Sequence, residues 1–287
     1  MDLFNETRIT GIPRLWASIS GGQTSMKMAW DLKQKFDGEL LFVFANSGEE
    51  SEKTLEFVDR CDREWDLGAV WVEAVVHEGT KSSTHRVVDF ATASRRGEPF
   101  EAVIAKYGIP NRNFPHCTRE LKLNPMRSYV NAAGWGDAPV AIGIRADEPR
   151  RLRRDAATKG IVYPLAHWWR NDKSDVNWWW ESMPFRLGLE EREGNCKWCF
   201  KKSLAKHFAN ITSNPEWYDF PRRMEATHTA TNRAHDPQVF FRGGLSTDDL
   251  FRHYQAVGMD NDHRPSNKEF GGCSESCEAF GQIDEAA

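Results

Sequence analysis

The sequence has no apolar run long enough to cross a membrane, and its N-terminus lacks the pattern of a secretory signal peptide. It also contains no internal repeat and no low-complexity tract. These absences exclude a membrane-spanning protein and predict a soluble protein of the cytoplasm.

Positive charge is not in excess either, because the formal net charge of the 287 residues is -4. This balance argues against a protein that coats nucleic acid, although it leaves a local basic patch open. The six cysteines come without secretory features, so they suggest a metal site or reactive thiols rather than a disulfide framework. With 40% apolar and 28% charged residues, the chain can bury one full core and carry a small additional unit.

What the sequence does contain, at residues 14–28, is a stretch that predicts an anion site. An apolar strand runs into a turn with Gly21-Gly22, and a helix follows. The glycines let the amides of the turn converge, and the helix start adds unpaired N–H groups and partial positive charge. Ser20, Thr24 and Ser25 add hydroxyl donors, whereas the Gly-Lys-Ser/Thr ending of the Walker loop is missing. The alternative interpretation is a Ser/Gly turn that only caps the helix.

A regular alternation of strands and helices follows this turn. Helical spacing predicts a helix from about Thr24 to Phe36, and the apolar run 40–45 predicts a buried strand that ends in a polar loop at 46–50. A helix that begins near Ser51 and a strand over 70–76 come next. This order predicts a parallel sheet with helices on both faces and ligands at the carboxyl ends of the strands.

The later part of the pattern is less regular. Residues 77–115 are polar and mixed, with a helix expected from Glu98 to Tyr107. A helix over 118–133 is interrupted by Pro125, and an apolar strand at 140–144 again ends in a polar loop. Beyond residue 165 the alternation fades, so we place a boundary there. It divides the chain into a sheet-containing domain, 1–165, and a Trp- and Cys-rich C-terminal appendage, 166–287.

A cluster of arginines follows the last of these predicted strands. Its members are Arg145, Arg150, Arg151, Arg153 and Arg154. Guanidinium groups suit phosphate and sulfate oxygens because several N–H donors meet two acceptors at once. A parallel sheet would place this cluster beside the glycine turn, which favours an anion site. The alternative is a solvated basic helix start that nearby acidic residues balance.

Cys117 precedes a predicted helix that carries two cations one turn apart, Arg119 and Lys122. A helix start and nearby cations would lower the pKa of this thiol and favour the nucleophilic thiolate. The alternative is a small buried cysteine beside a helix cap.

Two close pairs of cysteines, Cys196 with Cys199 and Cys273 with Cys277, predict a four-thiolate metal site. Such a site would hold an iron-sulfur cluster or zinc and would fasten the C-terminal tail to the appendage. The alternative is four unrelated thiols. The tryptophans at 168–169 and 178–180 could stack nucleobases, but consecutive helical positions face different ways, so we assign most of them to packing.

Six segments of the chain occur together, in this order, in one known family. They are Ser20-Gly-Gly-Gln-Thr-Ser25, Phe44-Ala-Asn-Ser-Gly-Glu-Glu50, Ala93-Ser-Arg-Arg-Gly-Glu-Pro-Phe100, Cys117-Thr-Arg-Glu-Leu-Lys122, Ile142-Gly-Ile-Arg-Ala-Asp-Glu-Pro-Arg150 and Gly194-Asn-Cys-Lys-Trp-Cys-Phe200. On these segments the chain resembles the phosphoadenosine phosphosulfate reductase family, of the phage and prophage type. That family is part of the adenine nucleotide alpha hydrolase-like superfamily of PP-loop proteins.

The resemblance implies a five-stranded parallel sheet with helices on both faces and a small C-terminal appendage that contains cysteines. It also implies that ATP or a related adenine nucleotide lies across the strand ends. The residues that would bind this nucleotide are Ser20, Gly21, Gly22, Gln23, Thr24, Ser25, Asn46, Gly48, Glu49, Arg145 and Arg150. Relatives in the superfamily activate a carbonyl by adenylation, and some carry iron-sulfur clusters for sulfur transfer, which would suit the paired cysteines.

Two departures from the family pattern limit what it implies about the reaction. Thr24 stands where the PP-loop pattern has an Asp, so Asp147, Glu148 or Glu49 would have to supply the carboxylate for a phosphate-bound Mg²⁺. The C-terminal Glu-Cys-Gly-x-His motif of the true reductases is replaced by Gly272-Cys-Ser-Glu-Ser-Cys277. Ordinary sulfate assimilation is therefore not expected.

The leading hypothesis is an enzyme that cleaves the alpha-beta phosphate linkage of an adenine nucleotide and couples this to modification or thiolation of a second substrate. That substrate stays unknown, with nucleic acid open as its class, and homo-oligomerisation stays open as well. The catalytic candidates are Cys117, Arg119, Lys122, Asp147 and Glu148. The alternatives are a sulfonucleotide reductase with Cys117 or Cys273 as the attacking thiol, and a non-catalytic module that binds nucleotide and metal and acts on a phage or host partner.

Overall fold

The computed structural model describes residues 8–194, 196–228 and 238–257. Its centre is a six-stranded sheet with the strand order β4-β3-β2-β1-β5-β6. The strands are β1 (Arg14–Ile19), β2 (Glu39–Asn46), β3 (Val70–Val75), β4 (Thr84–Val88), β5 (Val140–Ile142) and β6 (Ile161–Val162).

Five of these strands run parallel, as the sequence predicts, but β4 pairs antiparallel with β3 and adds a sixth strand. The five-stranded sheet expected from the sequence is therefore incomplete by one edge strand. The side chains of β4 are exposed or half-buried. An edge strand of this kind has no apolar alternation by which a sequence could reveal it.

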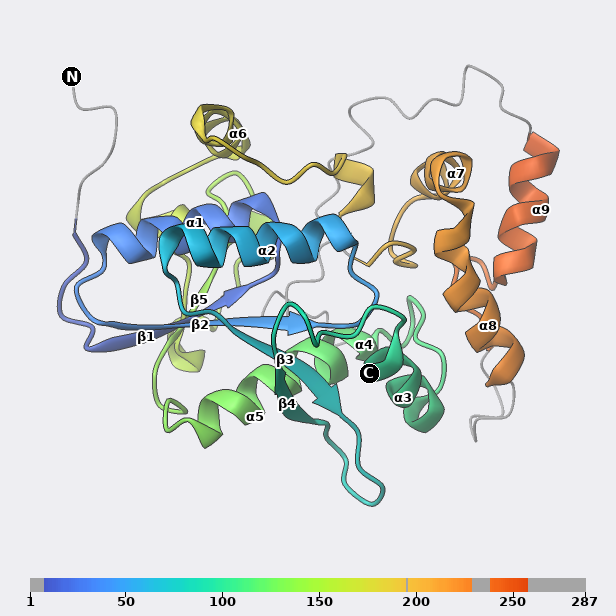
Figure 1. The fold of residues 1–287 in the computed structure, drawn as a ribbon, viewed down its shortest axis with the longest axis horizontal. Helices are drawn as coiled ribbons and strands as arrows, with labels where there is room; N and C mark the ends of the chain where they lie inside the picture. Colours follow the sequence, from blue (N-terminus) through green and yellow to red (C-terminus); the bar gives the residue numbers. More distant parts are fainter. Residues whose placement is uncertain (1–7, 195, 229–237, 258–287) are drawn as a thin grey trace.

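Helices cover both faces of the sheet. Figure 1 shows α1 and α2 on one face, α5 on the other, and α6 packed over α1 and α2 on the side away from the sheet. The helices α7, α8 and α9 lie beyond the carboxyl end of β2. The α-helices are α1 (Gln23–Lys35), α2 (Glu52–Trp65), α3 (Glu98–Tyr107), α4 (His116–Thr118), α5 (Asn124–Ala132), α6 (Lys173–Ser182), α7 (Leu204–Ser213), α8 (Asp219–Thr227) and α9 (Thr247–Val257). Short 3-10 or π-helical turns are η1 (Arg119–Leu123), η2 (Pro149–Arg151), η3 (Ala157–Lys159), η4 (Pro164–Trp168), η5 (Glu191–Glu193) and η6 (Pro215–Tyr218).

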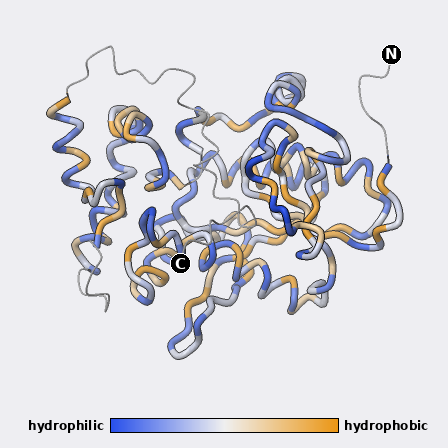
Figure 2. The backbone as a smooth tube through the Cα atoms, turned by 180° about the vertical axis from the view of Figure 1, so that it is seen from behind, coloured by the Kyte–Doolittle hydropathy of each residue, from blue (hydrophilic) through white to orange (hydrophobic). Residues whose placement is uncertain are grey.

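The central strands are buried on both faces because alternate residues enter different clusters. In β1, Leu15 and Ala17 pack with the α1 and α2 side of the sheet, whereas Trp16 packs with Met126 and Val130 of α5. This two-residue period explains why the strands read as continuous apolar runs. Figure 2 shows that apolar and polar residues also succeed one another along the helices.

The helix predicted over 118–133 is observed, but it begins at His116 and contains a π-helical turn, η1. The backbone N–H of Asn124 donates to the carbonyl of Arg119, five residues earlier. Pro125, which follows, has no N–H and would clash with a carbonyl four residues earlier in a regular α-helix. The wider turn before the proline avoids that clash, so the predicted interruption is a local widening and not a break.

Most of the tryptophans are packing residues, as the sequence predicts. Trp169, Trp179 and Trp180 are buried, and the latter two pack between α1 and α2, against Trp30 and Trp65. Trp178 is 54% exposed.

The C-terminal helices share a cluster with α3. Trp198 stacks on Phe220 of α8 and lies beside Phe100 of α3.

The division at residue 165 stays a prediction. No helix among the described residues is long and apolar enough to cross a membrane.

Candidate functional site

The turn between β1 and α1 depends on its first glycine. Gly21 has a φ of 76°, and a Cβ at this position would lie 2.6 Å from Cγ2 of Thr54 in α2. A side chain there would force the turn away from α2. Gly22 caps α1 in an extended conformation and offers no side chain of its own to the first N–H groups of the helix. Free amides at a helix start are the donors that bind anions.

Two of the predicted hydroxyl donors bind each other across this turn. The hydroxyl of Ser25 accepts from the backbone N–H of Ser20 at 3.1 Å and donates to the carbonyl of Gly22 at 2.9 Å. The hydroxyl of Ser20 also donates to Ser25 Oγ, at 3.1 Å. Ser25 is buried and braces the turn, whereas Ser20, Gln23 and Thr24 are partly exposed beside it.

The loop after β5 lies against this turn. A Cβ on Gly143 would lie only 2.9 Å from Cα of Ser25, so the close approach requires glycine. Two residues later, Arg145 Nη1 donates to Thr24 Oγ1 at 3.3 Å. The sheet order places β5 on one side of β1 and β2 on the other, so the direction of strand addition reverses at β1. Open parallel sheets bind their ligands at such a point.

Carboxylates surround Arg145 in this loop. Its Nε donates to Asp147 at 2.9 Å, and its Nη2 lies 3.6 Å from Glu148, which also binds Arg151. Asp147 is exposed, whereas Glu148 is buried. Arg150, predicted as a second anion ligand, is exposed. The structure thus brings Arg145 to the glycine turn and leaves Arg150 at the surface.

The loop after β2 is shaped by Asn46. Its side-chain amide donates to Glu73 at 2.7 Å and to the carbonyl of Ser94 at 2.8 Å, and its Oδ1 accepts from the N–H of Gly48 at 3.1 Å. Gly48 has a φ of 80° and would, with a Cβ, lie 3.0 Å from Gly97 Cα. Asn46 and Gly48, both predicted to bind nucleotide, thus hold the loop in shape. Their contact with a nucleotide stays a prediction.

Glu49 is a buried carboxyl group with a perturbed pKa. Burial raises its pKa from 4.5 to about 7, although the positive charge of Lys197 and a hydrogen bond from Trp198 oppose this shift. The Trp198 bond, from indole Nε1 to Oε2, measures 2.6 Å. A carboxyl group with a pKa near neutrality at a strand end can accept and release a proton at physiological pH.

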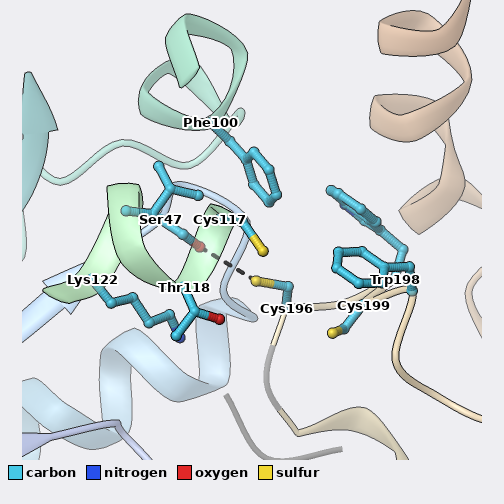
Figure 3. A pocket seen from close by; sticks show the side chains of 10 residues that line it. Ser47, Phe100, Cys117, Thr118, Lys122, Cys196, Trp198 and Cys199 are labelled. Carbon is cyan, nitrogen blue, oxygen red and sulfur yellow. Dashed lines mark hydrogen bonds between the residues drawn. The ribbon is translucent and has the colours of Figure 1, made fainter. Parts of the chain in front are cut away.

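Three cysteines from two distant segments of the chain line one small pocket. We call it the thiol pocket, and its walls include Cys117, Cys196, Cys199, Ser47 and Lys122. Figure 3 shows the thiols of Cys117 and Cys196 pointing toward each other. The volume of the pocket is about 20 Å³, which is room for about one water molecule.

An unpredicted acidic residue, Glu50, joins these groups. Lys122 Nζ lies 3.2 Å from Glu50 Oε1, and Ser47 donates to the same oxygen at 3.1 Å. The thiol of Cys196 lies 3.6 Å from Ser47 Oγ and 4.0 Å from Glu50. The only signal in the sequence was the place of Ser47 and Glu50 in the polar loop after a buried strand. Arg119, predicted as a partner of Cys117, instead binds Glu120 at 2.7 Å.

The predicted metal site is only partly within the described residues. Cys273 and Cys277 lie outside them, and among the residues that are described no group of three or more His, Cys, Asp or Glu side chains is placed to hold a metal ion. The thiol pocket is also too small for an iron-sulfur cluster as it stands. The described residues therefore do not fit a metal centre on their own, and the four-cysteine site stays a prediction.

Comparison with known proteins gives one relative along nearly the whole chain. No family model matches the sequence. The uncharacterized nin region protein ORF290 of Escherichia phage lambda is 32% identical over 283 residues, which cover 93% of this chain and 96% of that protein. An uncharacterized protein of Methanocaldococcus jannaschii is 23% identical over 159 residues, which cover 53% of this chain and 28% of that protein.

Among solved structures, the U34-tRNA thiolase NcsA from Methanococcus maripaludis with its 4Fe-4S cluster is similar with a TM-score of 0.38 and 14% identity. The match covers 94% of this chain and 80% of that chain. A TM-score at this level carries no conclusion about activity. The resemblance to the phosphoadenosine phosphosulfate reductase family stays a prediction.

Proposed function

The chain belongs to the family of the nin region protein ORF290 of Escherichia phage lambda, which is itself uncharacterized, and we propose from its site that it is an adenine-nucleotide-dependent enzyme. It binds ATP or a related nucleotide at residues 20–25, cleaves the linkage between the alpha and beta phosphates, and thereby activates a second substrate. Sulfur transfer to that substrate is the form of the reaction that the thiol pocket favours.

The observation that carries this proposal is the meeting of three anion-binding features at one point of the sheet. The glycine turn, the open amide end of α1 and the guanidinium of Arg145 converge where β1 separates β2 from β5. Amides and a helix start stabilise phosphate without the movement of any side chain, and an arginine adds charge-assisted hydrogen bonds. A turn that only capped the helix would need no arginine from the loop after another strand.

In the proposed reaction, an oxygen of the second substrate attacks the alpha phosphorus. A new O–P bond forms, the bond to the beta phosphate breaks, and pyrophosphate leaves with the electron pair. In the sulfur-transfer form, a sulfide-level donor such as hydrosulfide then attacks the carbon that bears the adenylated oxygen, a C–S bond forms, and AMP leaves with that oxygen. The turn at residues 20–22 and Arg145 hold the phosphates and offset their charge. Asp147 and Glu148 carry ion pairs with arginines and so do not fit a magnesium site as they are placed, and no step here depends on that metal.

A sulfonucleotide reductase is the second candidate, and the thiol pocket is the observation that favours it. The thiolate of Cys117 would attack the sulfur of the sulfonucleotide, form an S–S bond and release the nucleotide phosphate. A second thiol, from Cys196 or Cys199, would then form a disulfide with Cys117 and release sulfite. This reaction oxidises the two thiols by two electrons and reduces the sulfur by the same number.

Product analysis separates these reactions. The purified protein would be incubated with ATP, alone and together with total RNA and sulfide, and, separately, with a sulfonucleotide, and the mixtures assayed for pyrophosphate, AMP and sulfite. Pyrophosphate together with AMP supports the proposal, whereas sulfite without pyrophosphate supports the reductase. Tight nucleotide binding without any product would favour the non-catalytic module instead.

A further inference from the structure

A larger cavity lies next to the glycine turn. Its volume is about 400 Å³, and we call it the α6 cavity because Asn177, Trp180 and Glu181 of α6 form one wall. Gln23 at the start of α1 and the segment 186–190 form the others. A space of this size accommodates a small ligand rather than a few waters.

Two hydrogen bonds hold the walls of this cavity in place. The indole Nε1 of Trp180 donates to the backbone carbonyl of Gln23 at 2.9 Å, which ties α6 to the beginning of α1. Lys53 Nζ donates to the carbonyl of Gly188 at 3.0 Å, which ties the segment 186–190 to α2. The cavity is thus assembled from elements that are fixed to both helices behind the glycine turn.

The polar side chains of the α6 cavity are of the kinds that read the edges of nucleobases. Gln23 and Asn177 each offer an amide donor and an amide acceptor, Glu181 offers acceptors, and Arg186 offers donors. Amides pair with adenine, guanidinium with guanine, and carboxylates with the amino group of cytosine. Nothing in the described part of the chain uses these four side chains for a hydrogen bond or an ion pair.

The charge and apolar surface of the cavity favour a base over a phosphate. Among the lining side chains Glu181 offsets the single guanidinium of Arg186, while Glu190 is already paired with Arg192, so a phosphate group would meet repulsion from Glu181 as well as attraction. Leu187 and Leu189 add apolar surface for the faces of a planar ring.

We infer that the α6 cavity binds a nucleobase of a single-stranded nucleic acid, and that this strand is the second substrate activated at the neighbouring glycine turn. The inference rests on the proposed function for the role of the base as acceptor, but the binding itself does not depend on turnover. The base enters between Arg186 and the amide of Asn177, with the leucine side chains against one face of the ring.

The test uses the full chain and short homopolymeric oligoribonucleotides, one for each of the four bases, with an abasic strand of the same length. Binding of each strand is measured by fluorescence anisotropy, and binding of ATP by calorimetry. Arg186→Ala and the double variant Asn177→Ala with Glu181→Ala should each weaken binding of the preferred strand about tenfold, the effect of losing a hydrogen bond to a charged group. Their ATP affinity should equal that of the parent.

Arg170→Ala is the matched control, because Arg170 is also an exposed arginine but does not line the cavity, and it should change neither affinity. The inference is overturned if no strand binds, or if the abasic strand binds as tightly as the others. It is also overturned if the cavity variants lose ATP affinity, which would mean that the cavity holds the base of the nucleotide itself. A Gly22→Asp variant that binds strands normally but not ATP would separate this inference from the phosphate site.

Discussion

At Gly22, the effect of an added negative charge on nucleotide binding can be tested separately from the effect of an added side chain. The φ of -87° at this position is accessible to any residue, and the atom nearest to a Cβ there is Ser20 Oγ at 3.7 Å. Gly22→Asp should therefore fold but should abolish nucleotide binding, because its carboxylate would repel the phosphates. Calorimetric titration with ATP measures this. Gly22→Ala is the control for added bulk, and equal affinity of the Asp variant and the parent would remove the phosphate site.

Glu49 gives a second test at this scale, through pH. Its pKa is raised from 4.5 to about 7 by burial, against the opposing effects of Lys197 and Trp198, so the folded state holds the proton more tightly than the unfolded state. Its contribution to stability is therefore greatest below pH 4.5 and falls as pH rises toward 7.

Glu49→Gln should remove this dependence, because the amide oxygen can still accept from Trp198 and carries no charge. The variant should be more stable than the parent by up to about 3 kcal/mol at about pH 8, with the gain shrinking as pH falls. Urea unfolding of the parent and the variant, from pH 4.5 to about pH 8, measures the difference in their free energies of unfolding. A gain that stays constant with pH would show that Glu49 does not titrate near neutrality.

At the scale of elements, the prediction concerns α6, which one hydrogen bond joins to the glycine turn. Trp180→Phe keeps an aromatic ring but removes the indole N–H that donates to Gln23. It also leaves space in a fully packed layer, so we expect a loss of about 1 to 3 kcal/mol in the free energy of unfolding.

Trp178→Phe, on the same helix, is the comparison for this variant. Its side chain is 54% exposed, so the change should stay within about 0.5 kcal/mol. Thermal and urea unfolding measure both. Equal losses in the two variants would show that the bond from Trp180 and its packing contribute nothing particular to α6.

Elements differ in how far their sequences reveal them. The strands β1 and β2 are found from sequence because they are nearly continuous buried apolar runs, and the helix α3 because its buried residues recur at helical spacing. The strand β4 is missed because it lies at the sheet edge with exposed side chains. The site divides in the same way: the glycine turn is local and readable, whereas the contact of Cys196 with Ser47 spans 149 positions and follows only from the fold.

At the scale of the whole molecule, the prediction is that two cysteine pairs far apart in the sequence come together. We predict that Cys196, Cys199, Cys273 and Cys277 bind one metal centre, an iron-sulfur cluster rather than zinc. Single serine variants, prepared without oxygen, would each be assayed for iron, zinc and acid-labile sulfide, and loss of any one thiol should release metal.

Cys61→Ser is the control, because Cys61 is buried in α2 and burial raises the pKa of its thiol. Cys117→Ser is a further informative variant, since Cys117 lines the thiol pocket with Cys196 and Cys199. Metal that is lost from the Cys117 variant but kept in the Cys273 and Cys277 variants would move the ligand set from the C-terminal tail to the thiol pocket.

β1 is the first strand in the described part of the chain, and yet the sheet closes around it late. The loop after its neighbour β5 supplies Arg145, which lies 121 positions after its partner Thr24, and the donor Trp180 follows its acceptor Gln23 by 157 positions. Contacts of such long range form only after the intervening chain has been made, and they slow folding. On the ribosome, the glycine turn therefore emerges early, but its anion site is complete only after the 121 further positions that lead to Arg145 have been made.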